Sequence, residues 1–161
     1  MNHELKARRK EFYSFWMGID QLYDRWAKAH GLSLDGLFIL CAIWSSLEKQ
    51  EPCTPHRISE EWLMPKQTVS TLLKGMEQKG LLRLEPSEQD RRSKLIRLTP
   101  AGESKLQKIL PALSGLEERS LNRMTAAERL EMSRRNQQFL CFFQEEMRQE
   151  LAKAAPEGEL C

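Results

Sequence analysis

The sequence contains no apolar run long enough to cross a membrane. No stretch of its 161 residues approaches the ~18 consecutive apolar residues that a bilayer-spanning helix needs. The first residues, Met1 to Lys6, lead into an amphipathic segment and not into the apolar core of a signal peptide. We therefore expect a protein of the cytoplasm that does not contact membranes.

Residues that build metal and catalytic sites are also scarce. The four cysteines form no Cys-x-x-Cys pair, and the three histidines do not complete a metal-ligand spacing. No nucleophile–base pair and no phosphate-binding glycine loop is visible. We therefore expect no cofactor and no enzymatic activity. For the thiols we expect reduced side chains, with Cys41 and Cys141 buried, Cys53 in a loop and Cys161 on a loose tail.

Charge of one sign does not dominate, because the net charge is only +2. Its distribution is more informative. Residues 65–97 carry eight basic and four acidic side chains, a net charge of +4, and the remainder of the chain carries −2. Concentrated positive charge indicates a surface for a polyanion such as nucleic acid.

Helical periodicity is what the first eighty residues do contain. Apolar side chains three and four positions apart predict a helix that ends at Gly31 and a second one capped by Ser33. Thr54-Pro55 predicts the start of a short helix that reaches about Trp62. Another helix is expected from Pro65 to Gly80. No strand is predicted in this part of the chain.

The pattern changes after Gly80. Residues 81–85 and 94–98 have extended character, and the polar segment 86–93 between them predicts a hairpin with a long, basic tip. Thr99-Pro100 repeats the cap-and-proline signal for a further helix. Thr125 and Glu128 form a capping box for the last one, and residues 154–161 are expected to be a flexible tail.

The order of short helix, tight turn, helix and hairpin is that of a winged helix-turn-helix, whose second helix lies in the DNA major groove. In the helix after Pro65, one face is apolar and should point to the core (Val69, Leu72, Leu73 and Met76). The opposite face is polar (Lys66, Gln67, Ser70, Thr71 and Lys74). Glutamine can bond to adenine, and lysine can reach phosphate or guanine. The alternative is an ordinary solvated helix face.

The hairpin tip strengthens the case for DNA. In Asp90-Arg91-Arg92-Ser93-Lys94, three cations surround a protruding loop. A guanidinium at such a tip can enter the minor groove, where narrow A·T tracts concentrate negative potential. Asp90 would orient Arg92 through a charge-assisted hydrogen bond. The alternative is a solvated, charged loop.

The run from Leu32 to Gly102 resembles the MarR family of winged-helix regulators. The resemblance is carried by five pieces in this order and spacing: Lys66-Gln67-Thr68-Val69-Ser70, Leu72-Leu73, Met76-Glu77-Gln78-Lys79-Gly80-Leu81, Asp90-Arg91-Arg92-Ser93-Lys94 and Leu98-Thr99-Pro100-Ala101-Gly102. The flanking helices fit the family's plan without carrying motifs. The resemblance implies a mainly α fold with a small β-hairpin wing.

It also implies a two-fold homodimer built by helices from both chain ends, here Leu5–His30 and everything after Thr99. Four apolar side chains cover more than one stripe of the last helix, which independently suggests burial against two surfaces (Phe139, Leu140, Phe142 and Phe143). The expected organisation is an N-terminal dimerisation helix over 1–31, a winged helix-turn-helix over 32–100, dimerisation helices over 101–153 and a tail over 154–161. A single self-contained core is the alternative.

Family members often release DNA when a small aromatic or phenolic ligand enters a cleft beside the winged helix. The resemblance points to Tyr13, Trp16, Tyr23 and Trp44 for such a cleft, and plain core aromatics are the alternative. Other relatives sense oxidants through a cysteine near the N-terminus. No cysteine precedes Cys41 here, although Cys41 or Cys53 could serve differently.

The sequence therefore predicts a DNA-binding repressor that leaves a pseudo-palindromic operator when a ligand binds. Its contacts with the major groove and its phosphates would come from Lys66, Gln67, Thr68, Ser70, Thr71 and Lys74, and its wing contacts from Asp90, Arg91, Arg92 and Lys94. Two alternatives remain open: a cysteine-based redox regulator on the same fold, and a winged-helix protein-interaction module that does not bind DNA.

Overall fold

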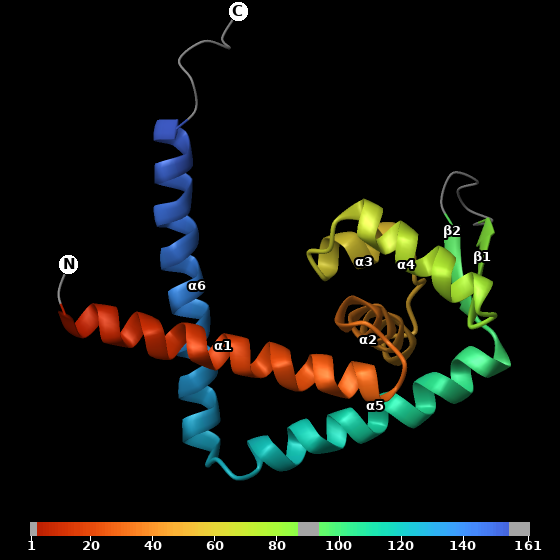
Figure 1. The fold of residues 1–161 in the computed structure, drawn as a ribbon, viewed down its shortest axis with the longest axis horizontal. Helices are drawn as coiled ribbons and strands as arrows, with labels where there is room; N and C mark the ends of the chain where they lie inside the picture. The colour runs from red at the N-terminus through yellow and green to blue at the C-terminus, as the bar shows by residue number, and fades with distance from the viewer. Residues whose placement is uncertain (1–2, 87–93, 155–161) are drawn as a thin grey trace, which may run out of the picture. The chain divides into compact units, whose positions relative to one another are not determined.

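The computed structural model describes residues 3–86 and 94–154 of the chain. Within these residues, six helices and two strands follow one another (Figure 1). They are α1 (His3–Ala29), α2 (Leu34–Glu48), α3 (Pro55–Glu61), α4 (Lys66–Gln78), β1 (Leu82–Pro86), β2 (Lys94–Leu98), α5 (Pro100–Leu121) and α6 (Ala126–Ala154). This mainly helical fold with a two-stranded wing confirms the predicted fold class.

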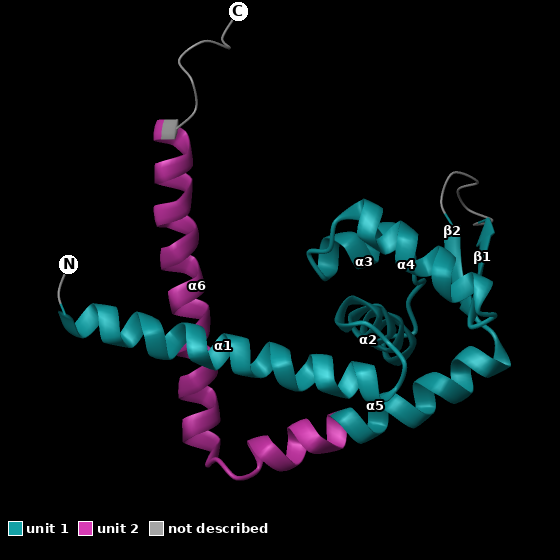
Figure 2. Ribbon diagram, viewed as in Figure 1, with its two compact units in different colours: residues 1–113 teal, residues 114–161 magenta. Residues whose placement is uncertain are grey.

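The chain divides into two compact units, residues 1–113 and residues 114–161 (Figure 2). α5 contributes its first turns to unit 1 and its last turns to unit 2. The predicted division into dimerisation and DNA-binding segments concerns what the segments do, and it stays a prediction.

The predicted helix boundaries are set by local capping. The Ser33 Oγ accepts a hydrogen bond from the Gly36 amide at 3.1 Å, and the Thr54 Oγ1 accepts one from the Arg57 amide at 3.2 Å. Gly31 and Gly80 have φ angles of 67° and 68°, the left-handed conformation that ends a helix most readily at glycine. These local signals confirm the boundaries read from the sequence.

One boundary differs by a residue. Pro65 was expected at the first position of its helix, but it precedes α4 with φ −57° and ψ 134°. The extended ψ places Pro65 at the N-cap, where its carbonyl already accepts from the Val69 amide at 3.1 Å. Proline fits this position because it has no N–H to leave unsatisfied.

The core of unit 1 forms around α2, which contacts both α1 and α4. α4, the wing and the first turns of α5 contribute further apolar side chains to the same cluster. Its largest fully buried members are Leu37, Ile39, Leu40, Ile43, Val69, Leu73, Leu82, Leu106 and Ile109. Because burying one such side chain stabilises the fold by about 1.5–3 kcal/mol, this cluster fixes the wing and α4 to the rest of unit 1.

Gly102 lets the start of α5 lie directly against the base of the wing. A Cβ atom at this position would stand 1.8 Å from the Leu81 carbonyl oxygen. The Thr99 amide donates to the same oxygen at 3.1 Å, and the Thr99 Oγ1 donates to the Gly80 carbonyl at 2.6 Å. Only glycine fits where two backbone segments approach so closely.

Unit 2 has almost no interior of its own. The Thr125 amide donates to the Glu128 carboxylate at 2.8 Å, and the Glu128 amide donates to the Thr125 Oγ1 at 3.2 Å, so the predicted capping box is confirmed. Of the side chains at 126–153, all but the half-buried Arg129 are exposed. The large apolar ones among them are Leu130, Met132, Phe139, Leu140, Phe142, Phe143, Met147 and Leu151.

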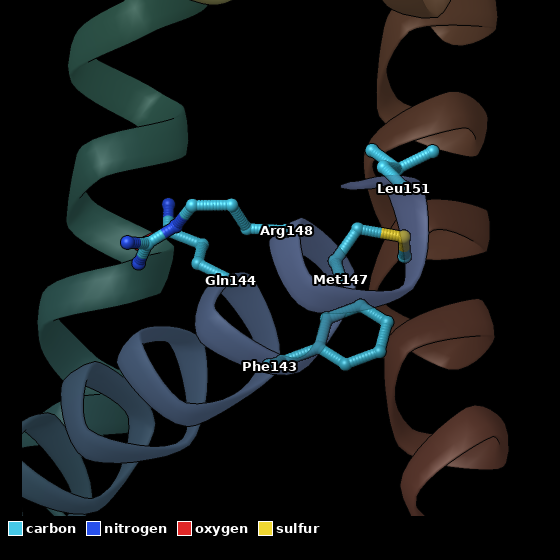
Figure 3. A pocket seen from close by; sticks show the side chains of 5 residues that line it. All are labelled: Phe143, Gln144, Met147, Arg148 and Leu151. Carbon is cyan, nitrogen blue, oxygen red and sulfur yellow. The ribbon is translucent and has the colours of Figure 1, made fainter. Parts of the chain in front are cut away.

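A hollow of about 370 Å³ lies on this exposed surface of α6. Phe143, Met147 and Leu151 follow each other at intervals of four residues and point to one side of the helix (Figure 3). Gln144 and Arg148 point to the other side. α6 thus presents a continuous apolar stripe without covering it.

The cysteines correct part of the sequence interpretation. Cys141 is exposed, because α6 has no element covering it in unit 2. Cys53 lies in a loop as expected, but it is buried, and Cys41 is only half-buried. Cys161 lies outside the described residues.

No single described helix is both long and apolar enough to span a membrane. α1 and α2 pass that test only when they are taken together, across a break at which they bend by 85°. The apolar character of α2 is already explained by its buried side chains in the core of unit 1.

Candidate nucleic-acid interface

The turn between α3 and α4 is closed by hydrogen bonds that set the two helices against each other. The Ser59 Oγ donates to the Met64 carbonyl at 2.7 Å, and the Met64 amide donates to the Ser59 carbonyl at 3.1 Å. Between them, Leu63 adopts a left-handed φ of 51° and is 90% exposed. The tight turn brings α3 and α4 into contact as a helix-turn-helix.

α4 separates its apolar and polar residues onto two faces. Val69, Leu73 and Met76 are buried in the core, and Leu72 is half-buried. On the polar face, four of the predicted DNA-contacting residues are exposed and two are partly exposed: Lys66, Gln67, Thr71 and Lys74 in the first group, Thr68 and Ser70 in the second. The structure thus brings these six residues together on the solvent side of one helix.

The N-terminus of α4 is open as well. Pro65 has no side-chain group that could cap the helix. The first N–H groups of an α-helix have no partner within it, and together with the helix dipole they attract anions. The start of α4 therefore suits a phosphate group, as the sequence suggested.

The wing pairs its strands antiparallel in one register. Leu82 lies opposite Leu98 and Leu84 opposite Ile96, and these four side chains are buried or half-buried. Arg83 lies opposite Arg97, and both are exposed. This arginine pair was not among the DNA contacts predicted from the sequence, although the alternation of 81–85 could have placed Arg83 on the outer face.

One acidic side chain among the described residues lies close to this pair, at the edge of ion-pair distance. The Arg97 Nε lies 3.9 Å from the Glu85 carboxylate. Like charges directly opposite each other weaken a strand pair, so two arginines here are not explained by wing stability. They add positive charge to the exposed face of the wing.

Most of the predicted wing tip lies outside the described residues, including Asp90, Arg91 and Arg92. Lys94 is the first residue of β2 and is exposed. The strand ends at Pro86 and Lys94 therefore fix where the tip begins and where it returns.

Each described strand of the wing is hydrogen-bonded to the helix-turn-helix or to the loop that precedes it. On β1, the Leu84 amide donates to the Glu77 carboxylate of α4 at 2.9 Å. On β2, the Ile96 amide donates to the Cys53 carbonyl, in the loop before α3, at 2.9 Å. Neither bond could be predicted from the sequence, because both donors are backbone amides, which every residue except proline carries. Both bonds hold the wing and the helix-turn-helix together.

Cys53 has the surroundings of a structural thiol. Burial raises the pKa of its thiol, and a hydrogen bond with Ser46 offsets part of that rise. Because the thiolate is the form that reacts with oxidants, a raised pKa lowers reactivity. The environment of Cys53 therefore argues against a redox sensor at this residue.

The four residues predicted for a ligand cleft do not gather at one place in the single chain. Tyr13 and Trp16 are exposed on α1, with exposures of 56% and 44%. Tyr23 is half-buried, with its ring 6.2 Å from that of Phe38. Ten residues of one helix separate Tyr13 from Tyr23, a rise of roughly 15 Å. Trp44 is half-buried on α2.

Comparison with known proteins agrees with this geometry. A family model described as "MarR family" matches residues 45–93, which include α3, α4 and β1. No relative among curated proteins matches the sequence at a significant level.

Solved structures share the fold over most of the chain. The MepR–DNA complex from S. aureus is 20% identical with a TM-score of 0.70, covering 82% of this chain and 93% of that one. NMB1585, a MarR family regulator from Neisseria meningitidis, is 22% identical with a TM-score of 0.67, covering 96% and 100%. AbsC, a MarR family transcriptional regulator from Streptomyces coelicolor, is 17% identical with a TM-score of 0.73, covering 92% and 97%.

The sequence match falls on the helix-turn-helix and the first strand of the wing, in the part of the molecule whose geometry suits nucleic acid. The shared fold extends this likeness to the flanking helices. Together they show a winged helix-turn-helix fold like that of solved MarR structures, in a chain whose residues 45–93 match the MarR family model.

Proposed function

We propose that this regulator is a repressor that binds a pseudo-palindromic operator as a homodimer and releases it when a small ligand binds. The observation that carries the proposal is the exposed polar face of α4, held in one unit with the base of a basic wing. The S. aureus MepR structure, which has a similar fold, is a complex with DNA. As a transcription regulator the chain is not an enzyme, and we place its action in the cytoplasm with the chromosome.

The residues of α4 would read the major groove. Gln67 can form a paired hydrogen bond with adenine, and Lys74, two turns further along the same face, can reach guanine or a phosphate. The exposed or partly exposed neighbours would add phosphate and base contacts (Lys66, Thr68, Ser70 and Thr71). In the wing, Arg91 and Arg92 would enter the minor groove, oriented by Asp90, with Lys94 on an adjacent phosphate.

Uncovered apolar side chains support a homodimer. α1 exposes Phe15 and Met17 beside its exposed aromatic residues, and α6 exposes its apolar stripe. Apolar surface of this extent marks an interaction site in a soluble chain. A second copy of the same chain offers a matching surface and places two copies of α4 in successive major grooves.

The ligand would be a small aromatic or phenolic molecule bound near Tyr23 and Trp44. Both side chains are half-buried, so they can pack against a ring and still be reached from solvent. Tyr13 and Trp16 would join such a site only through the dimer, because they lie further along α1.

Fluorescence anisotropy with labelled DNA from upstream of the regulator's own gene tests the proposal. We expect tight binding that weakens steeply as salt is raised, because lysine and arginine contacts release counterions. Arg92→Ala should weaken binding by about 1–3 kcal/mol at fixed salt, and Lys74→Ala should reduce the salt slope by about one. Lys108→Ala, which alters an exposed lysine of α5, is the control.

Absent or salt-insensitive binding would favour a protein-interaction module in place of a DNA reader. Adding phenolic compounds to the same assay tests the ligand. If these compounds release DNA from the wild-type chain but not from Tyr23→Ala or Trp44→Ala, the result supports the proposed ligand site. Release by peroxide that is lost in Cys41→Ser or Cys53→Ser would favour the redox alternative.

A further inference from the structure

Arg57 of α3 uses its guanidinium to hold the loop that precedes its own helix. Its Nη1 donates to the Pro52 carbonyl at 3.0 Å, and its Nη2 donates to the Glu51 carboxylate at 2.5 Å. Its Nε and Nη2 also donate to Glu61, one turn further along α3, at 2.9 and 2.7 Å. Arg57 therefore joins residues 51 and 52 to both ends of α3.

That loop is the support on which β2 rests. The Cys53 carbonyl, directly after the two residues held by Arg57, accepts the hydrogen bond from the Ile96 amide at 2.9 Å. Ile96 is buried in the middle of β2, and the strand begins at Lys94, two residues after Arg92 of the tip. A shift of the loop at Cys53 would therefore move the acceptor of the hydrogen bond that holds the middle of β2.

The two strands of the wing are supported differently. β1 is attached to α4 through Glu77, on the helix proposed to enter the major groove. β2 is attached to the loop that Arg57 holds. The hydrogen-bonded support of β2 therefore depends on the loop that Arg57 holds, and that of β1 does not.

We infer that Arg57 is a positioning residue for the wing. It holds residues 51–53 so that β2 presents the arginine-bearing tip to DNA, and it touches no DNA itself. This inference rests on the proposed function, because it concerns how the wing contributes to operator affinity.

A role in stability alone does not explain this cluster. The side chains of Arg57, Glu51 and Glu61 are 31%, 46% and 41% exposed. Ion pairs this open to solvent contribute little to the free energy of unfolding. Removing Arg57 should therefore leave unit 1 folded, with its helix-turn-helix in place.

Amide hydrogen exchange measured by NMR tests the mechanical part without DNA. In Arg57→Ala we expect the Ile96 amide to exchange about tenfold faster, because the Cys53 carbonyl is no longer held in place. The Leu84 amide, bonded to Glu77, should be unchanged. His56→Ala is the matched control, because the His56–Glu60 pair (3.2 Å) lies on the same helix and does not reach the loop.

A double-mutant cycle with DNA tests the functional part. Arg57→Ala should lower operator affinity roughly tenfold in an otherwise wild-type chain, but not in an Arg92→Ala background, where the wing contact is already lost. In a Lys74→Ala background the full loss should persist. Arg57→Lys should behave like Arg57→Ala, because one ammonium group cannot reproduce the planar fork of donors.

Each arm can overturn the inference. An unchanged exchange rate of the Ile96 amide would contradict the inference and leave the proposed function intact. The same holds if Arg57→Ala lowers affinity equally in the wild-type and Arg92→Ala backgrounds. If the wild-type chain binds no DNA, the proposed function fails and the affinity arm of the inference fails with it. If Arg57→Ala does not fold, Glu51→Ala releases the loop from the other side and should produce the same exchange at Ile96.

Discussion

α2 and α6 both carry many apolar residues, but those of α2 are largely buried in the single chain and those of α6 are exposed. Seven of the fifteen residues of α2 are buried at the centre of unit 1. α6 spans twenty-nine residues, and none of its described side chains is buried. The difference shows that unit 1 completes its own core, whereas no described element of unit 2 covers α6.

Unit 2 contains local interactions in place of a buried core. Thr125 and Glu128 cap α6, and Glu131 pairs with Arg135 at 2.6 Å. The ion pair contributes about 0.2–0.5 kcal/mol and the cap about 1 kcal/mol. They favour the helix but do not compensate for leaving its large apolar side chains in water.

Introducing a charge into the exposed face of α6 should produce the largest effect. We expect Phe142→Asp, at a side chain that is 57% exposed in the single chain, to dissociate the proposed homodimer. An aromatic residue at an interface centre contributes about 2 kcal/mol or more. Two-fold symmetry removes it twice, so the dissociation constant should rise by roughly 1000-fold. Analytical ultracentrifugation measures this directly.

A matched variant tests whether a charge at any exposed apolar residue would have the same effect on association. Leu63 is 90% exposed in unit 1, and Leu63→Asp should leave the association state unchanged. If Phe142→Asp sediments like the wild-type chain, α6 does not carry the interface and the comparison between α2 and α6 loses its explanation.

Alanine substitution of one glycine in each unit should have the next largest effect, and the two substitutions should change stability in opposite directions. Gly102→Ala places a Cβ atom 1.8 Å from a backbone oxygen of the wing base, and we expect it to destabilise unit 1 by about 3 kcal/mol. At Gly115, in unit 2, the nearest atom is the mobile Arg119 Nη1 at 3.1 Å. Gly115→Ala should therefore stabilise α5 by about 0.5–1 kcal/mol. Denaturant unfolding of both variants gives the comparison, and equal effects would contradict it.

The sequence predicted what local signals determine. Thr54-Pro55, Thr99-Pro100 and the pair Thr125–Glu128 act within one helical turn, so their caps could be read directly and are confirmed. The polar face of α4 follows from helical periodicity in the same way.

Long-range contacts could not be read in this way. The hydrogen bond from Ile96 to the Cys53 carbonyl joins residues more than forty positions apart and uses no side chain. The error at Cys141 has a related cause. The apolar pattern around it indicates burial, but a pattern cannot say whether the covering surface belongs to the same chain.

Leu63 is an exposed apolar residue with a left-handed backbone in unit 1. Relieving its backbone strain should give a smaller gain in stability. A left-handed φ costs a residue with a side chain about 1–2 kcal/mol, and this side chain is almost fully exposed. After the greater freedom of glycine in the unfolded chain is subtracted, Leu63→Gly should stabilise unit 1 by about 0.5–1 kcal/mol. Thermal unfolding measures the change, and a loss of stability would show that the Leu63 side chain makes a contact worth more than its strain.

Acid should reveal the smallest difference between the units. The hydrogen bond from Arg57 lowers the pKa of Glu51 in unit 1, and the hydrogen bonds from the amide and hydroxyl of Thr125 lower the pKa of Glu128 in unit 2. A carboxyl whose pKa is lowered by folding stabilises the native state above its unfolded pKa, and this stabilisation is lost as pH falls through the folded value. Both contributions should therefore be complete at pH 7 and should fade below the ordinary carboxyl pKa of 4.5.

Spectroscopy can assign the two losses, because all four tryptophans lie in unit 1. Glu51→Gln should flatten the acid dependence of the melting temperature followed by tryptophan fluorescence. Glu128→Gln should flatten the acid dependence of helix content followed by circular dichroism, and should leave the fluorescence transition as it is. Both carboxylates are open to solvent, so each effect should be small and should shrink further in high salt. The contrary outcome is that Glu128→Gln shifts the tryptophan transition as strongly as Glu51→Gln does. In that case the two units unfold together, and the conclusion that unit 1 is stable independently of unit 2 is wrong.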